Sequence, residues 1–377
     1  MLRLHVTAEG LQHVVASHPP LGIDDFCHYP PDEVQRLLAG KRRRMENQQL
    51  LRDQGYPCEI SLTILPGQAS RLHIDLDMIA ADALSFRIVM EDLARFYQQP
   101  PPQCTPVMEV AWFSYLAKRT HDPLLLSARE RDRAWWRQRL ADIPPAPAIP
   151  YTDRQCQTRR MAIQLNPQIS HALQHCARHH HLTLSSLFLA LFSLTMMEGF
   201  RQPALRINVP TFFRAPNITG GDDIVGDFSD LLLFSAELRP DETLLHYCQR
   251  TMTQLHEILG HGGYSGVSVM RDLSRLKGQL QYSPIVFTAG FGISGGVLFS
   301  ERVGGQLGEL AWVISQGPQV ALDAQVAWIG DGILINWDVR EDAFPPANCI
   351  SSLHVFTRSS NAWPRLRNTL MTAFRAG

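Results

Sequence analysis

Hydrophobic and polar residues alternate strictly from residue 71 to residue 77, and this alternation ends where a different pattern begins. One side of the extended chain carries Leu72, Ile74 and Leu76, and the other carries His73, Asp75 and Asp77. From Leu84 onward the apolar residues recur three or four positions apart, which predicts a helix. Two carboxylates, Asp77 and Asp82, and the hydroxyl of Ser85 therefore lie where a polar-faced strand meets a helix.

Structural roles are open to all three of these polar residues. Asp82 is suited to cap the helix by accepting a backbone N–H near Ser85, and Asp77 is suited to a solvated strand end. Spacing alone does not decide between these roles and chemistry, because perturbed carboxylates also occur in structural networks.

The rest of the chain interleaves the two periodicities, which predicts the α/β class. Helices are expected at 128–140, 167–179, 183–197, 242–259 and 265–276, and the helix at 183–197 is apolar enough to be buried. Strands are expected at 161–165, 205–209, 231–238, 285–288, 319–327 and 332–337. Glycine-rich stretches at 290–296 and 304–308 predict loops, and the basic run 41–44 predicts the solvated face of a helix.

Two domains are expected from length, since 377 residues exceed the size at which a single core stops growing. The proline cluster formed by Pro144, Pro145, Pro147 and Pro150 is the natural connector, because proline-rich segments are extended and semi-rigid. We therefore predict an N-terminal domain at 1–147 and a C-terminal domain at 148–377.

The amino-acid composition limits which classes of binding partner are expected. Thirty-five basic residues nearly balance 36 acidic ones, so charge gives no reason to expect nucleic acid or an anionic membrane as a partner. No apolar run approaches the roughly 20 residues of a spanning helix. Seven cysteines without close pairing predict reduced thiols and a cytoplasmic protein. Adjacent histidines at 179–181 face different directions on a helix end and cannot share one ion, so no bound metal is predicted.

Several short motifs follow the Asp77–Asp82–Ser85 pattern in a fixed order. They are Trp135-Trp136-Arg137-Gln138-Arg139-Leu140, Asn208 to Arg214, Val225-Gly226-Asp227-Phe228-Ser229, Tyr264-Ser265-Gly266-Val267, Val286-Phe287-Thr288, Gln316 to Asp323, and Asn336-Trp337-Asp338. With Asp-x-x-x-x-Asp-x-x-Ser, this ordered series resembles the heterocyclization domains of nonribosomal peptide synthetases, which are relatives of condensation domains. The resemblance covers nearly the whole chain.

This resemblance implies a fold and a reaction. The fold is two chloramphenicol-acetyltransferase-like lobes arranged as a V around a central tunnel. The reaction joins a carrier-bound acyl group to carrier-bound cysteine, serine or threonine, and then closes a thiazoline or oxazoline ring with loss of water, as in siderophore-like peptide biosynthesis. Peptidyl or aryl carrier proteins and adjacent synthetase modules are the implied partners. They bear the substrates on phosphopantetheine, so the chain itself binds no cofactor, and we expect a monomer.

The resemblance also implies the site. Thr288 and Asp323 occupy the family's cyclodehydration positions, and Asp77 and Asp82 occupy the aspartate motif. We predict these four as catalytic residues, with Asp82 holding its loop through an arginine for which Arg214 is the candidate. The predicted substrate-binding residues are Ser85, Ser229 and Gln316.

Three departures from the family, one of which is an atypical tail at 345–377, keep two alternatives open. Met1 aligns inside the first lobe, so either the start lies upstream or the first lobe is truncated at its N-terminus. Gly317 and Pro210 stand where the family carries threonine. The alternatives are a condensation-only amide synthase and a degenerate, non-catalytic domain that docks carrier proteins.

Overall fold

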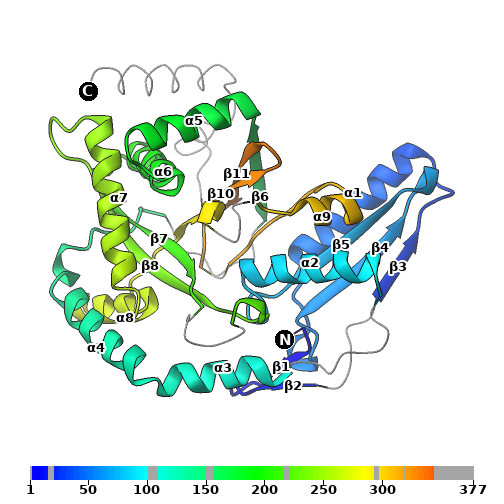
Figure 1. The fold of residues 1–377 in the computed structure, drawn as a ribbon, viewed down its shortest axis with the longest axis horizontal. Coiled ribbons are helices and arrows are strands. Elements are labelled where there is room, and N and C mark those ends of the chain that lie inside the picture. Colours follow the sequence, from blue (N-terminus) through cyan, green and yellow to red (C-terminus); the bar gives the residue numbers. More distant parts are fainter. Residues whose placement is uncertain are drawn as a thin grey trace. The chain divides into compact units, whose positions relative to one another are not determined.

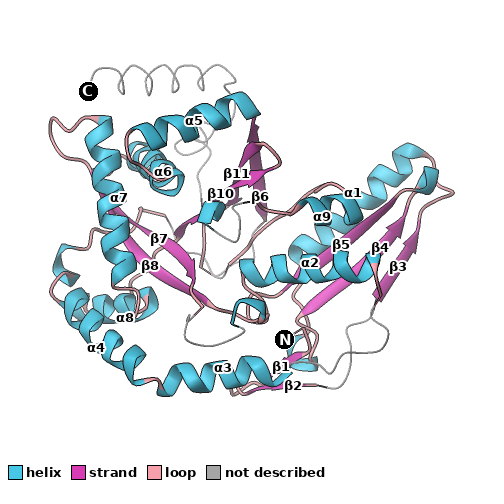
Figure 2. Ribbon diagram, in the orientation of Figure 1, coloured by secondary structure: helices cyan, strands magenta, loops and turns pink. Residues whose placement is uncertain are grey.

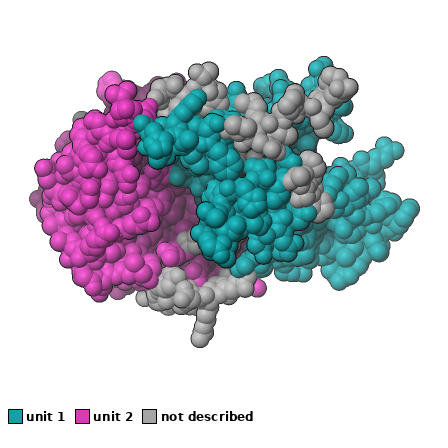
Figure 3. Space-filling model, turned by 90° about the horizontal axis from the view of Figure 1, so that it is seen from below, with its two compact units in different colours: residues 1–121, 212–229, 299–312 teal, residues 122–211, 230–298, 313–377 magenta. Residues whose placement is uncertain are grey.

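The computed structural model describes residues 2–15, 21–100, 109–149, 157–214, 221–292, 297–317 and 319–343. Its chain forms two compact units (Figure 3). Unit 1 comprises Met1–His121, Phe212–Ser229 and Phe299–Trp312, and unit 2 comprises Asp122–Thr211, Asp230–Leu298 and Val313–Gly377. The predicted boundary at residue 147 and the V-shaped arrangement stay predictions. Met1, Pro150 and the loop residues 293–296 lie outside the described residues.

Unit 1 is built on a three-stranded sheet of order β3-β4-β5 (Figure 1). The strands are β3 (Leu21–Asp25), β4 (Cys58–Ile64) and β5 (Ser70–Leu76), and a hairpin of β1 (Leu4–Val6) and β2 (Gln12–Val14) forms a separate sheet. The helices are α1 (Pro31–Asn47), α2 (Ala83–Gln98), α3 (Glu109–His121) and α9 (Glu301–Leu307). Met90 and Ala94 of α2 pack against Val303 of α9, so distant segments share one small core.

The polar face of this sheet lies under helix α1. Lys41 Nζ forms an ion pair with Asp24 and lies 3.2 Å from Thr63 Oγ1, and its side chain is 8% exposed. The prediction that the basic run 41–44 is a solvated face is therefore wrong at Lys41. A carboxylate on β3 pairs with this lysine, which compensates for removing its ammonium group from water.

Unit 2 is built on a six-stranded sheet of order β6-β11-β10-β9-β7-β8. The strands are β6 (Thr158–Leu165), β7 (Ala204–Phe212), β8 (Ser229–Glu237), β9 (Ile285–Ala289), β10 (Leu322–Ile329) and β11 (Gly332–Arg340). The helices are α4 (Pro123–Arg137), α5 (Pro167–His179), α6 (Leu184–Phe200), α7 (Leu244–Gly260) and α8 (Gly266–Lys277) (Figure 2). Strands β9 and β10 are parallel, whereas β11 is antiparallel to both β10 and β6.

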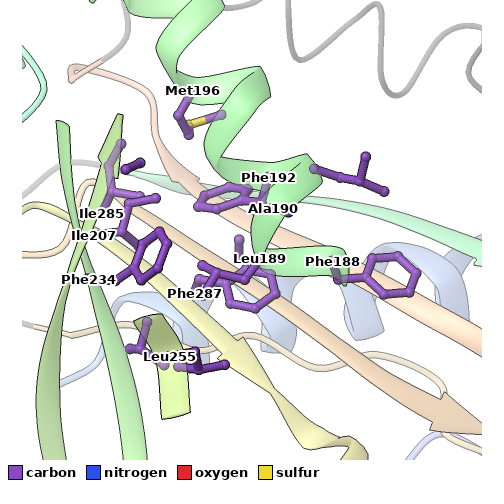
Figure 4. Packing of buried hydrophobic residues seen from close by; sticks show 14 of the residues in the cluster. Phe188, Leu189, Ala190, Phe192, Met196, Ile207, Phe234, Leu255, Ile285 and Phe287 are labelled. Atoms are coloured by element: carbon purple, nitrogen blue, oxygen red, sulfur yellow. The ribbon is translucent and has the colours of Figure 1, made fainter. Parts of the chain in front are cut away.

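Helix α6 supplies the centre of the unit 2 core. It is apolar nearly all round, which is typical of a buried helix. Phe192 lies beside Phe287 of β9 (Figure 4), with their ring centroids 5.3 Å apart. The ring of Phe192 also lies 5.6 Å from that of Trp337 on β11. The residues of β9, β10 and β11 that point toward α6 are therefore apolar, and alternate residues point to the other face.

The predicted elements are largely confirmed, including the α/β class, the strand before Asp77, the helix at 167–179 and the buried helix that follows. The loop prediction for 304–308 is wrong, because Gly304 and Gly305 lie inside α9. Capping explains that helix, since Ser300 Oγ accepts the N–H of Val303.

Some features bear on partners. Among the described residues, no single helix is long and apolar enough to cross a membrane, although α5 and α6 pass such a test as a pair bent by 101°. Within the same residues, no group of three or more His, Cys, Asp or Glu side chains is placed to hold a metal ion. The described cysteines Cys27, Cys58, Cys176 and Cys248 are free thiols.

Close packing of α8 against β8 yields a first prediction. A Cβ atom on Gly266 would lie 2.4 Å from the backbone oxygen of Leu231, and backbone cannot swing aside as a side chain can. Gly266→Ala should therefore lower the free energy of unfolding by about 1–3 kcal/mol, measured by urea denaturation.

Gly260→Ala is the matched control, because Gly260 ends α7 with no atom within 4 Å of an added Cβ. It should leave stability unchanged or raise it by up to about 1 kcal/mol. Equal stability of the two variants would contradict the packing argument.

Candidate functional site

The junction of β5 and α2 carries the aspartate motif in unit 1. Asp77 follows β5 directly: its N–H donates to the Pro57 carbonyl at 2.8 Å, and its Oδ1 accepts the N–H of Ile79 at 3.0 Å. Its side chain is partly exposed. The predicted catalytic role of Asp77 stays a prediction.

Asp82 caps α2 and is enclosed by donors of unit 1. Its Oδ1 accepts the N–H of Ser85 at 2.7 Å, and Arg214 Nη2 and Nη1 lie 3.2 and 3.3 Å from its two oxygens. The side chains of Asp82 and Arg214 are 0% and 3% exposed. The predicted cap and the predicted arginine partner are both confirmed.

Ser85 extends this network to the motif at Gly226. Its hydroxyl donates to the Gly226 carbonyl at 2.8 Å and accepts the Gly226 N–H at 3.0 Å. A Cβ on Gly226 would lie 2.3 Å from the ring of Trp112, so the backbone approaches closely because the residue is glycine. These contacts tie segment 212–229 to α2. The catalytic role of Asp82 and the substrate-binding role of Ser85 stay predictions.

Asp227 and Ser229 form a local pair beside this network. Asp227 Oδ1 accepts the Ser229 N–H at 3.0 Å and also the Ser229 hydroxyl. Burial raises the pKa of Asp227, although these hydrogen bonds from Ser229 oppose the rise. The hydroxyl predicted to bind substrate thus orients a carboxyl group, and its role toward substrate stays a prediction.

Thr288 and Asp323 come together in unit 2, on neighbouring parallel strands. Thr288 on β9 stands opposite Gln325 on β10, and Asp323 stands opposite Val286. Residues two apart on a strand face the same side, so Thr288, Asp323 and Gln325 share the face that points away from Phe287 and α6. The sheet thereby presents a hydroxyl, a carboxyl and an amide side by side.

Asp323 is the electrostatically unusual group of this face. Burial raises its pKa to about 6, against donation from Gln325 and Ser315. Gln325 Nε2 donates to Oδ2 at 2.9 Å, whereas Oδ1 is buried without a hydrogen-bond partner among the described residues. A carboxyl group with such a pKa exchanges protons readily near neutral pH.

Asp338 on β11 stands directly opposite Asp323. Arg160 on β6 donates to it through Nε at 2.7 Å and through Nη2, and the Ser315 N–H donates to its Oδ2 at 2.9 Å. The side chains of Arg160 and Asp338 are 7% and 1% exposed. One carboxyl group of this facing pair is thus matched by an arginine, and the other is not.

Gln316 lies at the rim of this region. It is exposed, and its Oε1 accepts a hydrogen bond from the Thr158 hydroxyl at 3.3 Å. The predicted substrate-binding role of Gln316 stays a prediction. Pro318 of the same motif lies outside the described residues.

A pocket of 210 Å³ lies in unit 2, near the starts of β9 and β10. Pro284, Ala321 and Arg340 line it, and Ala321 lies two residues before Asp323. Arg206 forms another wall, where its guanidinium donates to the carbonyls of Pro144 and Tyr282 at 3.0 and 2.7 Å. Thr288, Asp323, Gln325 and Asp338 are not among the residues that line this pocket.

Two residues of this network, Gln325 and Arg160, belong to none of the sequence motifs. Gln325 was detectable in principle, because strand alternation places it on the face of Asp323. Arg160 was not, because its partner Asp338 is 178 positions away and their pairing depends on β6 lying beside β11.

Several known proteins are similar to this chain. A family model described as condensation domain matches residues 45–289. Phenyloxazoline synthase MbtB of Mycobacterium tuberculosis is 38% identical over 92% of this chain, and pyochelin synthetase PchE of Pseudomonas aeruginosa is 31% identical over 89%. The chain spans about a quarter of the length of each of these two relatives, at 24%.

Solved structures share the fold. The cyclization-docking bidomain of the nonribosomal peptide synthetase EpoB from Sorangium cellulosum superposes with a TM-score of 0.82 at 24% identity, covering 98% of this chain and 74% of that one. The first condensation domain of the CDA synthetase gives a TM-score of 0.71 at 18% identity, covering 94% and 82%.

The buried ion pair of unit 1 yields a second prediction. Arg214→Met leaves the Asp82 carboxylate buried without its cation, which should lower the free energy of unfolding by about 3–5 kcal/mol. Arg239→Met, which removes an exposed pair with Glu237 at 3.9 Å, is the control and should change stability by about 1 kcal/mol or less. Urea denaturation measures both. Similar small losses would show that the pair is not a determinant of stability.

The raised pKa of Asp323 yields a third prediction. Its folded-state pKa of about 6 lies above the value of about 3.9 expected in the unfolded chain, so its contribution to stability is lost as pH rises through the folded value. Asp323→Asn should match the wild type near pH 4 and be more stable by about 2–3 kcal/mol at pH 7.

Urea denaturation at a series of pH values measures this difference, and Asp331→Asn, at an exposed position between β10 and β11, is the control. A constant difference across pH would mean that Asp323 does not titrate in the folded protein in this range.

Proposed function

The chain belongs to the condensation-domain family, and from this premise we propose that it is a heterocyclization domain. It joins a carrier-bound acyl group to carrier-bound cysteine, serine or threonine, and converts the new amide to a thiazoline or oxazoline. The observation that carries this proposal is the buried carboxyl group of Asp323 on the same sheet face as the Thr288 hydroxyl. The names of the relatives, an oxazoline synthase and a pyochelin synthetase, support it.

Two chemical steps are required. In condensation the amine nitrogen attacks the acyl thioester carbon, the C–N bond forms, the C–S bond breaks, and the thiol leaves with a proton. In ring closure the side-chain sulfur or oxygen attacks the amide carbon, and its proton passes to the amide oxygen, which becomes a hydroxyl. This hydroxyl then takes up a second proton and departs as water, and the nitrogen loses its proton. Water loss therefore requires a group that donates one proton to the departing hydroxyl and accepts one proton from the nitrogen.

Asp323 suits that exchange. In its protonated form it donates to the departing hydroxyl, and the resulting carboxylate accepts the proton released from nitrogen, so the enzyme ends as it began. A pKa near the working pH makes both forms accessible, and such general acid–base help is typically worth about 10²–10⁴-fold in rate. The Thr288 hydroxyl positions the intermediate, since it both donates and accepts hydrogen bonds.

The partners we propose are carrier proteins bearing phosphopantetheine thioesters and adjacent synthetase modules. The carriers would deliver both substrates, because the chemistry begins from two thioesters. A monomer in the cytoplasm remains our expectation.

Reconstitution tests this function and gives a fourth prediction. Intact-mass measurement of an acyl-loaded carrier and a cysteinyl-loaded carrier, with and without the protein, should show an acylated cysteinyl carrier lighter by one water. Amide without water loss would instead support the condensation-only amide synthase. No transfer from a folded sample would support the non-catalytic docking domain.

Variants then assign the step. Thr288→Ala and Asp323→Asn should retain amide formation and slow water loss, by about 10²-fold or more for Asp323→Asn. Asp331→Asn is the matched control and should behave as wild type. Equal loss of both steps in Asp323→Asn would contradict a role confined to ring closure.

A further inference from the structure

The facing carboxyl groups of Asp323 and Asp338 are an unusual feature of the unit 2 sheet. They are direct partners in the antiparallel pairing of β10 and β11, so they project from the same face, and side chains so placed have Cβ atoms about 4.5–5.5 Å apart. Both residues are buried, at 9% and 3% exposure. Two buried carboxylates this close repel each other, so ionising both is costly.

The two carboxyl groups have different surroundings, which favour different protonation states. Two guanidinium nitrogens of Arg160 donate hydrogen bonds to Asp338, one to each carboxyl oxygen, and this arrangement requires the carboxylate form. Asp323 receives neutral donors, the amide of Gln325 and the hydroxyl of Ser315. Among the described residues, the charged groups that act on Asp323 are Asp338 and Arg160.

Arg160 reaches Asp323 by a second route. Its Nη2 lies 3.5 Å from Gln325 Oε1, while Gln325 Nε2 donates to Asp323 Oδ2 at 2.9 Å. The guanidinium therefore favours the orientation of the Gln325 amide in which its NH₂ group faces Asp323. One cation thus fixes the charge on one carboxyl group and the hydrogen-bond donor to the other.

We propose that Arg160 is a positioning residue that keeps Asp338 as the ionised member of this carboxyl pair and leaves Asp323 as the member that gains and loses the proton of ring closure. This proposal rests on the proposed function for the use of that proton. Its physical content, which carboxyl group holds the proton, is independent of activity. Pairs of carboxyl groups driven to different protonation states are a recurring device for acid–base work.

Infrared spectroscopy of the protonated carboxyl band across pH tests the proposal directly. In otherwise wild-type protein, Asp323→Asn should remove one protonated carboxyl group that titrates near pH 6. In Arg160→Met the proton is shared, so adding Asp323→Asn should leave a protonated band from Asp338. The same band lost in both backgrounds would overturn the proposal.

The titration midpoint should move in opposite directions in two variants. Arg160→Met removes the neighbouring cation and should raise the midpoint by about one pH unit or more. Asp338→Asn removes the neighbouring anion and frees Arg160 to attract Asp323, so it should lower the midpoint by a similar amount. A purely structural role would move both midpoints the same way or neither, and that result would refute the proposal.

Two further variants act as controls. Arg159→Met makes the same chemical change at the adjacent β6 residue, whose side chain is 46% exposed and whose partner is Glu341, and it should leave the midpoint unchanged. Arg160→Lys restores the charge without the two-pronged grip and should return the midpoint toward wild type. Circular dichroism confirms that each variant is folded.

The pH profile of the water-loss step, measured in single turnover, should shift with the infrared midpoint. If the midpoints of Arg160→Met and Asp338→Asn shift in opposite directions but the protein catalyses no water loss, the proposal about Arg160 stands and the heterocyclization function is refuted. If water loss occurs but its pH profile is the same in Arg160→Met, Asp338→Asn and the wild type, the function stands and the role of Arg160 is refuted.

Discussion

The two-faced sheet of unit 2 is the constraint on which the rest of the structure depends. Burial of Phe287 and Trp337 against Phe192 of α6 fixes which side of β9 and β11 faces the core. A one-residue slip would exchange the two faces, so burial of one face sets the register of both. Thr288, Asp323 and Asp338 then come to the opposite face as a consequence. Packing of the hydrophobic core thus determines the sheet face on which these polar side chains lie.

In unit 1 a buried ion pair, and not a sheet register, positions the polar residues of the motif. The ion pair between Asp82 and Arg214 joins the start of α2 to a segment 132 positions away, and Arg214 also lies 3.9 Å from the ring of Phe228. The serine and the second aspartate of the motif are engaged by this network, which leaves Asp77 as its partly exposed member. The three polar residues of this motif therefore differ in burial, although they lie within nine positions of one another.

Much of this organisation was predictable from the sequence. Helix and strand periods located α5, α6 and β5, and the cap at Asp82 followed from residue type. Lys41 was mispredicted because its ion pair with Asp24 depends on how α1 crosses the sheet, which a local pattern does not contain. Arg160 was missed for a similar reason, since β6 meets β11 only after the sheet has formed. Local sequence patterns predict the helices and strands, whereas the buried ion pairs depend on contacts between distant parts of the chain.

The network around Asp323 shows why such pairing matters to function. A carboxyl group buried with an unpartnered oxygen is a liability to folding, because its ionised form is poorly solvated. Burial also raises its pKa to about 6, so its proton exchanges near neutral pH. Asp338 has that arginine and Asp323 does not, although they face each other across one pair of strands. A single arginine therefore gives different electrostatic surroundings to two carboxyl groups that share one sheet face.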